Sequence, residues 1–301
     1  MSRLSRSRQV SVVRLQGGIG NQLFGWNFGQ FLRERASVKV TYDMRDVDRN
    51  MTAHGFRLSG RNIPGRFIDT RKKRGLSRRH RPALLRQVSL SEVFARKWST
   101  SREEQQHRSP VTGFDQTVNL SDPADIYLGY YQSWRYCLGS NGIPRIKASD
   151  LLPKLQKKSS WFRGLVDEAR SKRVLMVHIR RGDYRRLKEM FGLLSADYYQ
   201  SAIKAALYGH DINDIWVFSD EPDSARRLMD DCHFKSARII SGREARDPSE
   251  ELTLISLGAV HVISNSTFSW WGAFLAENSA EVLFPDPWFS NHSEPEQLIP
   301  P

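Results

Sequence analysis

The chain has 301 residues and carries 46 Lys and Arg against 33 Asp and Glu, a formal net charge of +13. This length favours two domains, since a typical domain has roughly 100 to 200 residues. No stretch approaches the roughly 20 apolar residues of a membrane helix and no apolar signal core follows the basic start, so we expect a soluble, cytoplasmic protein. Cys137 and Cys232 are too few for a disulfide framework and lack metal-ligand spacing, which fits a reducing compartment.

The basic excess is concentrated in residues 3–8 and in the run 71–81. Such a field attracts phosphates, nucleic acids or anionic lipid surfaces without choosing among them, and a solvated, Arg-rich surface explains it equally well. A non-catalytic polyanion-binding protein is therefore one hypothesis for this chain. Peripheral contact with an anionic membrane surface is a second expectation from the same residues.

The first half predicts the start of a parallel α/β unit. Residues 1–9 are polar and basic and are expected to form a disordered tail. Residues 10–15 are an apolar, β-branched run that stops at Gly17-Gly18, and residues 21–35 carry apolar side chains at helical spacing, which predicts a strand, a glycine turn and a helix. A second strand, residues 38–42, should end at Asp43. Residues 44–121 give no clear pattern, and residues 126–132 are again strand-like.

The second half alternates more regularly. Strands are expected at residues 174–179, 215–218, 238–240, 259–264 and 281–284, and helices at residues 195–207, 222–230, from 248 onward and 266–277. Ser195 and Asp247 are typical N-cap residues, and Pro248 follows Asp247 at the first helical position. We therefore expect an N-terminal lobe at residues 10–150 and a C-terminal lobe, a doubly wound sheet, at residues 151–301. Ligands of such sheets bind beyond the carboxyl ends of the strands.

Three expected strand ends carry polar side chains. The strand 174–179 runs into Arg180-Arg181-Gly182-Asp183, and a pair of arginines suits the oxygens of a diphosphate, although a surface ion-pair cluster is as good an interpretation. Asp220 follows the next strand, where a carboxylate can accept paired donors from guanine or simply cap the following helix.

The third strand end is the run from Asn265 to Gly272, which opens a helix directly after a strand. Free backbone N–H groups and the positive helix end make such a turn an anion site. An ordinary capped helix whose aromatic residues belong to the core is the alternative.

The glycine-rich loop at residues 17–22 follows a strand and opens a helix, as in dinucleotide-binding proteins. In a nicotinamide-dependent oxidoreductase, Gly18 and Gly20 would approach the pyrophosphate and Asp43 would bind the ribose, but Leu23 stands where the fingerprint has its third glycine. Alternatively, the glycines let a sugar approach the backbone while Asn21 and Gln22 bond its hydroxyls.

Five segments taken in order resemble the α-1,2-fucosyltransferases of glycosyltransferase family 11. They are Gly17-Gly18-Ile19-Gly20-Asn21-Gln22-Leu23-Phe24, Gly129-Tyr130-Tyr131-Gln132, the HxRRGDY signature from His178 to Tyr184, Phe218-Ser219-Asp220, and Asn265 to Gly272 with the trailing Pro285 to Phe289. The resemblance implies a GT-B-like α/β fold of two Rossmann-type lobes with a cleft between them. It also implies transfer of L-fucose from GDP-β-L-fucose to a sugar hydroxyl with inversion, forming an α-1,2 linkage to a terminal galactose.

Carried over residue by residue, the resemblance assigns roles at these positions. It implies that Arg180 and Arg181 hold the diphosphate and stabilise the departing GDP, helped by the four polar residues at the helix start, Asn265, Ser266, Thr267 and Ser269. It places two residues near guanine, His178 and Asp220. It implies substrate contacts for the first loop through Gly18, Gly20, Asn21 and Gln22.

Our candidate for the general base is Asp183, with a structural role in the arginine loop as the equal alternative. We expect no metal cofactor and interpret Asp46-Val47-Asp48 as surface. The expected partners are GDP-fucose and a galactose-containing acceptor, including a lipid-linked one, and not nucleic acid.

Overall fold

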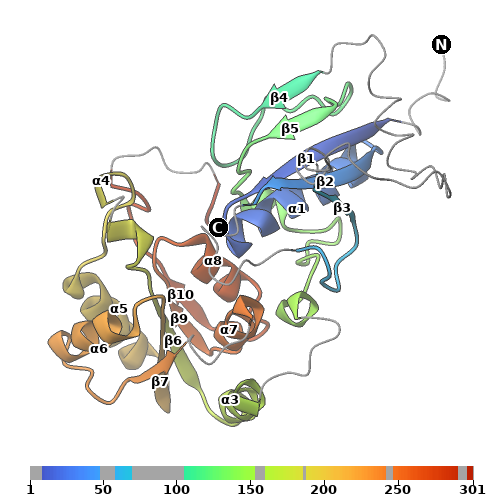
Figure 1. Ribbon diagram of the computed structural model, residues 1–301. Coiled ribbons are helices and arrows are strands. Elements are labelled where there is room, and N and C mark those ends of the chain that lie inside the picture. The colour runs from blue at the N-terminus through green and yellow to red at the C-terminus, as the bar shows by residue number, and fades with distance from the viewer. Residues whose placement is uncertain are drawn as a thin grey trace, which may run out of the picture.

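The computed structural model describes residues 9–47, 58–69, 105–152, 160–185, 188–241, 247–290 and 297–300. The basic tail and the run 71–81, on which the polyanion and membrane expectations depend, lie outside the described residues. Within the described part, the chain forms two lobes, each built on a five-stranded parallel sheet (Figure 1). The expected α/β fold of two Rossmann-type lobes, GT-B-like in architecture, is confirmed.

The N-terminal lobe has the strand order β3-β2-β1-β5-β4. Its strands are β1 (Val10–Gln16), β2 (Lys39–Asp46), β3 (Arg66–Ile68), β4 (Gln106–Arg108) and β5 (Ile126–Leu128). The helix α1 (Ile19–Arg35) follows β1, and the short 3₁₀ turns η4 (Trp134–Tyr136) and η5 (Ala148–Leu151) follow β5. The chain therefore leaves β1 toward β2 on one side and returns beside it as β5 on the other.

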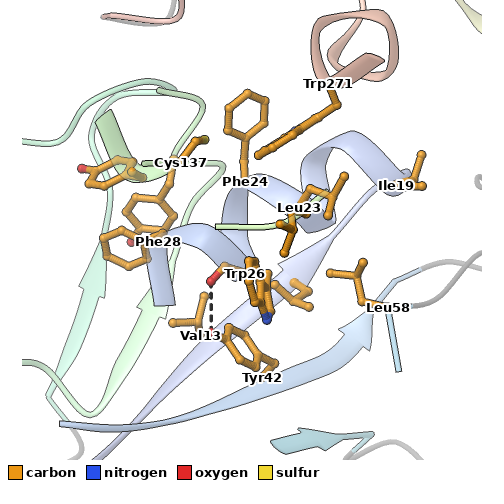
Figure 2. Packing of buried hydrophobic residues seen from close by; sticks show 14 of the residues in the cluster. Val13, Ile19, Leu23, Phe24, Trp26, Phe28, Tyr42, Leu58, Cys137 and Trp271 are labelled. Carbon is orange, nitrogen blue, oxygen red and sulfur yellow. Dashed lines mark hydrogen bonds between the residues drawn. The ribbon is translucent and has the colours of Figure 1, made fainter. Parts of the chain in front are cut away.

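The helix α1 is buried on most of its circumference because it is covered from several sides. Phe28 stacks on Tyr131 at 3.7 Å between ring centroids, and Tyr42 of β2 donates a hydrogen bond to the Trp26 carbonyl. Phe24 packs against Trp271 of the other lobe at 5.0 Å. Figure 2 shows Phe24, Phe28 and Tyr42 around the helix, with Trp271 reaching it from the other lobe. One hydrophobic core thus continues across the junction of the two lobes.

The C-terminal lobe has the strand order β10-β9-β6-β7-β8. The strands are β6 (Val174–Ile179), β7 (Asp214–Ser219), β8 (Arg238–Ser241), β9 (Val260–Val262) and β10 (Glu281–Leu283). All six residues of β6 are buried, as a central parallel strand with helices on both faces requires.

Helices cover both faces of this second sheet. Odd-numbered β6 residues such as Leu175 pack with α5 (Ala196–Gly209) and α6 (Pro222–Asp231). Even-numbered ones such as Met176 pack with α3 (Ser160–Ser171) and α7 (Pro248–Ile255). The helix α8 (Thr267–Phe274) lies on the side of the N-terminal lobe. This alternation of side chains along β6 decides where the two arginines beyond it point.

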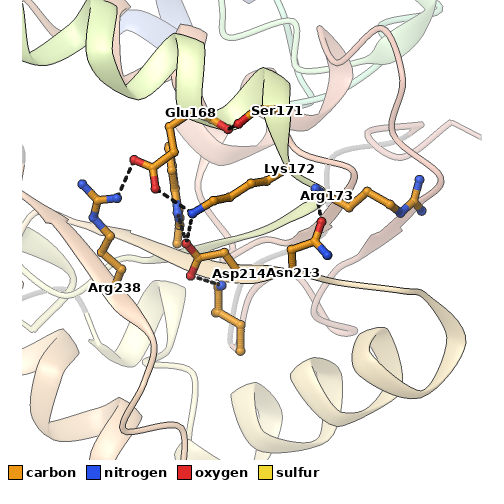
Figure 3. Close-up of polar contacts among 9 residues, drawn as sticks. Glu168, Ser171, Lys172, Arg173, Asn213, Asp214 and Arg238 are labelled. Carbon is orange, nitrogen blue, oxygen red and sulfur yellow. Dashed lines mark hydrogen bonds and ion pairs between the residues drawn. The ribbon is translucent and has the colours of Figure 1, made fainter.

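The amino ends of the C-terminal strands are held by surface ion pairs (Figure 3). Lys172 lies 2.8 Å from Glu168 and 3.4 Å from Asp214, and Arg238 lies 2.7 Å from Glu168. Such exposed pairs contribute little stability individually, but they join α3 to the starts of β7 and β8. The carboxyl ends of the same strands carry a different set of polar residues, described below.

Most predicted elements are confirmed to within a few residues. The two predicted N-caps are also confirmed: Ser195 accepts a hydrogen bond from the Tyr198 N–H at the start of α5, and Asp247 accepts one from the Ser249 N–H at the start of α7. Two expectations were wrong. β2 continues to Asp46 rather than ending before Asp43. The strand expected at 126–132 stops at Leu128, because the chain turns away and Tyr131 adopts a left-handed φ of 52°.

Candidate active site at the junction of the two lobes

The residues of the arginine strand end and of the Asn265 turn lie at the switch point of the C-terminal sheet. From β6 the chain proceeds through β7 and β8 on one side, and it returns on the other side as β9 and β10. The loops after β6 and β9 therefore flank the position at which doubly wound sheets bind ligands. The structure brings Arg180 and Asn265 to this one edge.

Asp220, at the end of β7, holds the arginine loop. Its carboxylate accepts hydrogen bonds from the backbone N–H groups of Arg181 and Gly182, both at 3.0 Å, and pairs with the Arg180 guanidinium at 3.1 Å. A Cβ on Gly182 would stand 2.6 Å from the Asp220 carboxylate, so only glycine allows this approach. Glu221, not Asp220, occupies the N-cap position of α6. The carboxylate expected to face guanine thus already accepts three donors of the loop.

Tyr184 fastens the other end of this loop. Its hydroxyl donates to the Asn265 carbonyl at 2.9 Å, and its ring stacks on Phe191 at 5.0 Å. The Asn265 amide donates in turn to the Phe191 carbonyl at 2.6 Å. The Arg180 guanidinium lies 5.6 Å over the Tyr184 ring. Asn265 is therefore buried and engaged in positioning the loop.

The two adjacent arginines diverge. Arg180 follows His178 by two positions, and the even-numbered residues at this end of the chain segment face the α7 and α8 side, where the His178 ring contacts Phe268. Burial, followed by the charge of Arg180, lowers the pKa of His178 to about 3. Ile179, two positions before Arg181, packs in the cluster that contains Tyr199 and Cys232, so Arg181 belongs to the α5 and α6 side. Burial raises the pKa of Tyr199 and of Cys232, and the charge of Arg181 opposes that rise. Successive side chains of an extended segment point to opposite faces. Arg180 alone thus faces the side on which α8 and the N-terminal lobe lie.

His178 is buried beneath Arg180. Its Nδ1 lies 2.8 Å from the Ser264 hydroxyl, which lies 3.3 Å from that of Ser269, and its ring is 5.5 Å from that of Phe268. Because its pKa is lowered to about 3, the imidazole is neutral at ordinary pH. His178 and Ser269 link β6, β9 and α8 through one chain of hydrogen bonds.

The start of α8 has the geometry of a capped helix. The Ser266 side chain accepts a hydrogen bond from the Phe268 N–H, and Ser269 donates to the carbonyls of Ser264 and Ser266. Ser266 and Ser269 are buried, whereas Thr267 is half-buried. The helix end contributes its positive partial charge beside Arg180, and of these side chains Thr267 is the most accessible.

Glu251 was not anticipated from the sequence, yet it faces the same edge. It lies on α7, half-buried, and burial followed by the Asp220 charge raises its pKa to about 7, while Arg180 opposes the rise. The Glu251 carboxylate makes no hydrogen bond to another residue that the structure describes. Its signal in the sequence is weak, because an acidic residue in the first turn of a helix is ordinary. Asp183 begins the 3₁₀ turn η6 (Asp183–Arg185) in the neighbouring loop.

The glycine-rich loop of the N-terminal lobe reaches this edge from the opposite side. Gly17 has a left-handed φ of 67°, and Gly18 is the N-cap of α1 without a side-chain cap. Gln22 is fully buried, donating to the Gly17 carbonyl at 3.0 Å and accepting from the Leu58 N–H at 3.3 Å. Asn21 accepts from Gln132 at 2.9 Å. Gln22 therefore shapes the loop, whereas Asn21 lies at its rim.

The two loops touch at Gly20. A Cβ added there would lie 2.6 Å from Thr267 Oγ1, and the Trp271 indole N–H donates to the Gly20 carbonyl at 3.0 Å. The amino ends of α1 and α8 thus meet, and both bring positive partial charge to the junction. This convergence, together with Arg180, makes the junction the most suitable place for an anionic ligand in the described part of the chain.

The features that favoured other functions are placed elsewhere. Asp43 lies inside β2, is buried, and its carboxylate accepts hydrogen bonds from both the backbone and the side chain of Arg45, so it does not stand free at a strand end for a ribose. Asp46 is 44% exposed and lies 3.5 Å from Arg14, as expected of a surface residue, while Asp48 is outside the described residues. Among the described helices, none combines the length and apolar composition that a membrane crossing requires.

Comparison with known proteins gives the family. The model of glycosyl transferase family 11 matches residues 116–297. An alpha-1,2-colitosyltransferase of Escherichia coli is 26% identical over 287 residues, 93% of this chain and 92% of that protein. The O-antigen biosynthesis glycosyltransferase WbnK of Escherichia coli is 32% identical over 127 residues, 39% of this chain and 40% of WbnK.

Solved structures with similar architecture include the fucosyltransferase NodZ from Bradyrhizobium, with a TM-score of 0.45 and 13% identity over 94% of this chain and 97% of NodZ. POFUT1 in complex with GDP-fucose has a TM-score of 0.45 and 11% identity over 92% of this chain and 98% of POFUT1. The family match covers more than half of the chain, from residue 116 to residue 297, and includes the arginine loop, Asp220 and the α8 turn. The chain therefore belongs to glycosyl transferase family 11 and is a glycosyltransferase.

Proposed function

We propose that this glycosyltransferase moves L-fucose from GDP-β-L-fucose to a sugar hydroxyl with inversion, forming an α-1,2 linkage to a terminal galactose. The observation that carries the proposal is the position of Arg180 at the switch point of the C-terminal sheet, beside the amino end of α8. A guanidinium and a helix N-terminus together stabilise the negative charge that builds on the β-phosphate as GDP departs. The proposed catalysis is thus electrostatic and needs no divalent metal.

In this proposal the two arginines have different tasks. Arg180 holds the diphosphate, because it lies on the side of α8 and the N-terminal lobe. Arg181 supplies its backbone N–H to Asp220, 3.0 Å away, and stabilises the loop. The half-buried Thr267 and the backbone of the first α8 turn supply further donors to the phosphates, while Asn265, Ser266 and Ser269 hold that turn in place.

We assign the recognition of guanine to Glu251 in place of Asp220. Guanine presents two N–H donors on one edge, and a carboxylate that accepts both is a specific partner for it. Asp220 already accepts donors from the arginine loop, whereas the half-buried Glu251 carboxylate accepts none from the described residues. His178 contributes through the neutral imidazole that supports the floor of the site.

Asp183 remains our candidate for the general base that takes the proton of the acceptor hydroxyl. It lies in the loop after β6, three residues beyond Arg180, and so belongs to the same edge of the sheet. Because the leaving group departs largely before the acceptor hydroxyl loses its proton in a transfer through an oxocarbenium-like state, we expect the base to contribute less than Arg180 does.

A colitosyl donor is the second candidate, favoured by the name of the E. coli relative. Colitose is fucose without the 3-hydroxyl, so an enzyme specific for fucose must bond that hydroxyl, whereas an apolar pocket discriminates weakly between the two sugars. A lipid-linked acceptor at an anionic membrane surface is the further proposal from the basic charge, worth about 1 kcal/mol per Lys or Arg near the surface.

Calorimetry followed by product analysis tests the proposed function. We expect saturable binding of GDP that survives moderate salt, and no binding of UDP or NAD. With GDP-fucose and a terminal β-galactoside, NMR of the product should show fucose on the 2-hydroxyl; with GDP-colitose in competition, the ratio of products identifies the donor. Binding of NAD, or only steeply salt-dependent binding to nucleic acid, would refute the proposal in favour of the oxidoreductase or the polyanion binder.

A further inference from the structure

The N-terminal sheet has a switch point of its own. β2 and β3 lie on one side of β1, and β5 and β4 lie on the other. The first turn of α1, which follows β1 and contains Asn21, and the loop after β5, which contains Gln132, therefore flank the position at which ligands of parallel sheets bind. A hydrogen bond of 2.9 Å from Gln132 Nε2 to Asn21 Oδ1 joins the two loops.

The amide oxygen of Gln132, in contrast to its nitrogen, has no hydrogen-bond partner among the described residues. Gln132 is only 6% exposed, and its Oε1 is buried without a hydrogen-bond partner among the residues that the structure describes. Most buried polar atoms have a partner, because an unsatisfied acceptor loses its hydration without compensation. An oxygen kept in this condition at a switch point is a candidate for binding a ligand.

The backbone holds Gln132 firmly in this position. Tyr131, directly before it, is fully buried with a left-handed φ of 52°, a conformation that a bulky side chain rarely adopts outside functional sites. The Gln132 N–H donates to the Thr112 carbonyl at 2.7 Å, and the Ser133 hydroxyl donates to the Gln297 carbonyl at 2.9 Å. These contacts fix the backbone at Gln132, and the hydrogen bond from its Nε2 to Asn21 orients the side-chain amide.

The groups around Gln132 select the chemistry of the ligand. Asn21 lies in the first turn of α1, whose N-cap Gly18 has no side-chain cap, so the helix start offers backbone N–H donors. Gln132, whose Nε2 bonds Asn21 in this first turn, offers its Oε1 as an acceptor. An anion accepts hydrogen bonds but cannot donate one to Oε1, whereas a hydroxyl group does both. A carbohydrate hydroxyl therefore fits this pair better than a phosphate or a carboxylate.

We propose that Gln132 is a specificity-determining residue for the acceptor: its Oε1 accepts a hydrogen bond from a hydroxyl of the acceptor sugar, and Asn21 keeps the amide in that orientation. The inference rests on the proposed function, in which Arg180 holds the donor at the facing edge of the other lobe. Gly20, next to Asn21, touches Thr267 of that edge, so Gln132 lies in the loop cluster where donor and acceptor must meet.

Gln132→Met keeps the approximate length of the side chain and removes both polar atoms. We expect it to raise the KM for a β-galactoside acceptor about 3- to 10-fold, the usual effect of one lost hydrogen bond, and to change the KM for GDP-fucose less. Gln9→Met is the matched control, because Gln9 bonds the Pro123 carbonyl at the amino end of β1 in the same lobe. A Gln132→Met enzyme whose donor KM rises as much as its acceptor KM would overturn the proposal.

A series of monodeoxy galactosides gives the decisive measurement. The wild-type enzyme should lose about 3- to 10-fold in kcat/KM when the hydroxyl bonded by Gln132 is absent, and Gln132→Met should not lose activity further on that one sugar. Gln132→Asn is the second variant, for the case in which Gln132→Met does not fold. Its side chain is one methylene shorter, so its amide oxygen should not reach the same hydroxyl and the result should be the same. Equal losses on every deoxy sugar in wild type and both variants would overturn the role of Gln132. Failure of wild type to use GDP-fucose at all would instead refute the proposed function.

Discussion

Gly20 of α1 and Thr267 of α8 lie in direct contact across the junction of the two lobes, so closely that a Cβ on Gly20 would stand 2.6 Å from the Thr267 Oγ1 and 2.6 Å from its carbonyl carbon. The contact brings the amino ends of two helices together at the edge where Arg180 lies. Because one of the contacting atoms belongs to the backbone, a side-chain rotation cannot relieve the overlap. The relative position of the lobes at this point therefore depends on the absence of a side chain at residue 20.

Gly20→Ala should separate the two helix ends. We expect a destabilisation of about 1 to 3 kcal/mol from overpacking. Turnover should also fall, because the starts of α1 and α8 no longer meet. Gly18→Ala is the control for stability, since its Cβ would meet nothing within 4 Å and its φ of −71° suits alanine. Thermal unfolding and turnover of the two variants provide the measurement. A Gly20→Ala enzyme that behaves like Gly18→Ala would contradict the importance of this contact.

Alanine substitutions of the two arginines should reduce turnover to different extents. Arg180→Ala removes charge-assisted hydrogen bonds worth about 1.5 to 3 kcal/mol, or roughly 10- to 150-fold in turnover, whereas Arg181→Ala should cost less because its backbone N–H still reaches Asp220. Arg180→Lys should recover only part of the loss, since the ammonium lacks the bidentate fork. Steady-state kinetics with GDP-fucose and melting temperatures of the three variants test this order. Equal turnover in both alanine variants would mean that the divergence of the side chains has no catalytic meaning.

Activity should persist in excess EDTA, because in the proposed function Arg180 and the α8 start supply the positive charge that a metal supplies in other transferases. The described residues contain no cluster of three His, Cys, Asp or Glu side chains that could hold a metal ion. The measurement is the transfer rate before and after chelation, with manganese added back. A rate that falls with chelator and returns with manganese would show that an acidic site, for example at Asp46, takes part.

The sequence predicted the strand ends of this site better than the directions of its side chains. Arg180 and Asp220 were expected at one sheet edge, because parallel strands of the right length precede them. The sequence could not show that Asp220 would bond the loop of Arg181, since that contact joins residues 39 positions apart and depends on the approach allowed by Gly182. Glu251 was missed because periodicity does not show which acidic residue of a helix start faces a neighbouring strand end.

The N-terminal lobe was predicted less completely. Its first strand and helix follow from an apolar run and a glycine turn, but β3 and β4 are three residues long and carry no clear alternation. Gln132 was placed in a strand, because Tyr130 and Tyr131 have high strand propensity. Packing of the Tyr131 ring against Phe28 overrides that preference and leaves Tyr131 in a left-handed conformation, which aims Gln132 at Asn21.

The free energy of unfolding should depend on pH because of Glu251. Burial, followed by the Asp220 charge, raises its pKa from 4.5 to about 7, so the protonated form favours the folded state. This contribution to stability is fully present below about pH 4.5 and is lost as pH rises through 7. The free energy of unfolding of the wild type should therefore fall relative to that of Glu251→Gln between pH 5 and pH 8, as measured by denaturation without ligand.

GDP binding should have the opposite pH dependence if Glu251 accepts the guanine N–H groups. The ionised carboxylate is the acceptor, and with a pKa of about 7 only about one tenth of it is ionised at pH 6, so GDP affinity should rise roughly tenfold from pH 6 to pH 8. His178, with a pKa of about 3, stays neutral throughout and adds nothing to this change. Glu251→Gln should bind GDP more weakly and without this rise. Glu277→Gln, which removes an exposed carboxylate 3.0 Å from Lys147, is the control and should keep the wild-type dependence. Parallel pH profiles of GDP affinity in wild type and Glu251→Gln would exclude Glu251 from guanine recognition, even where the stability measurement agrees with its raised pKa.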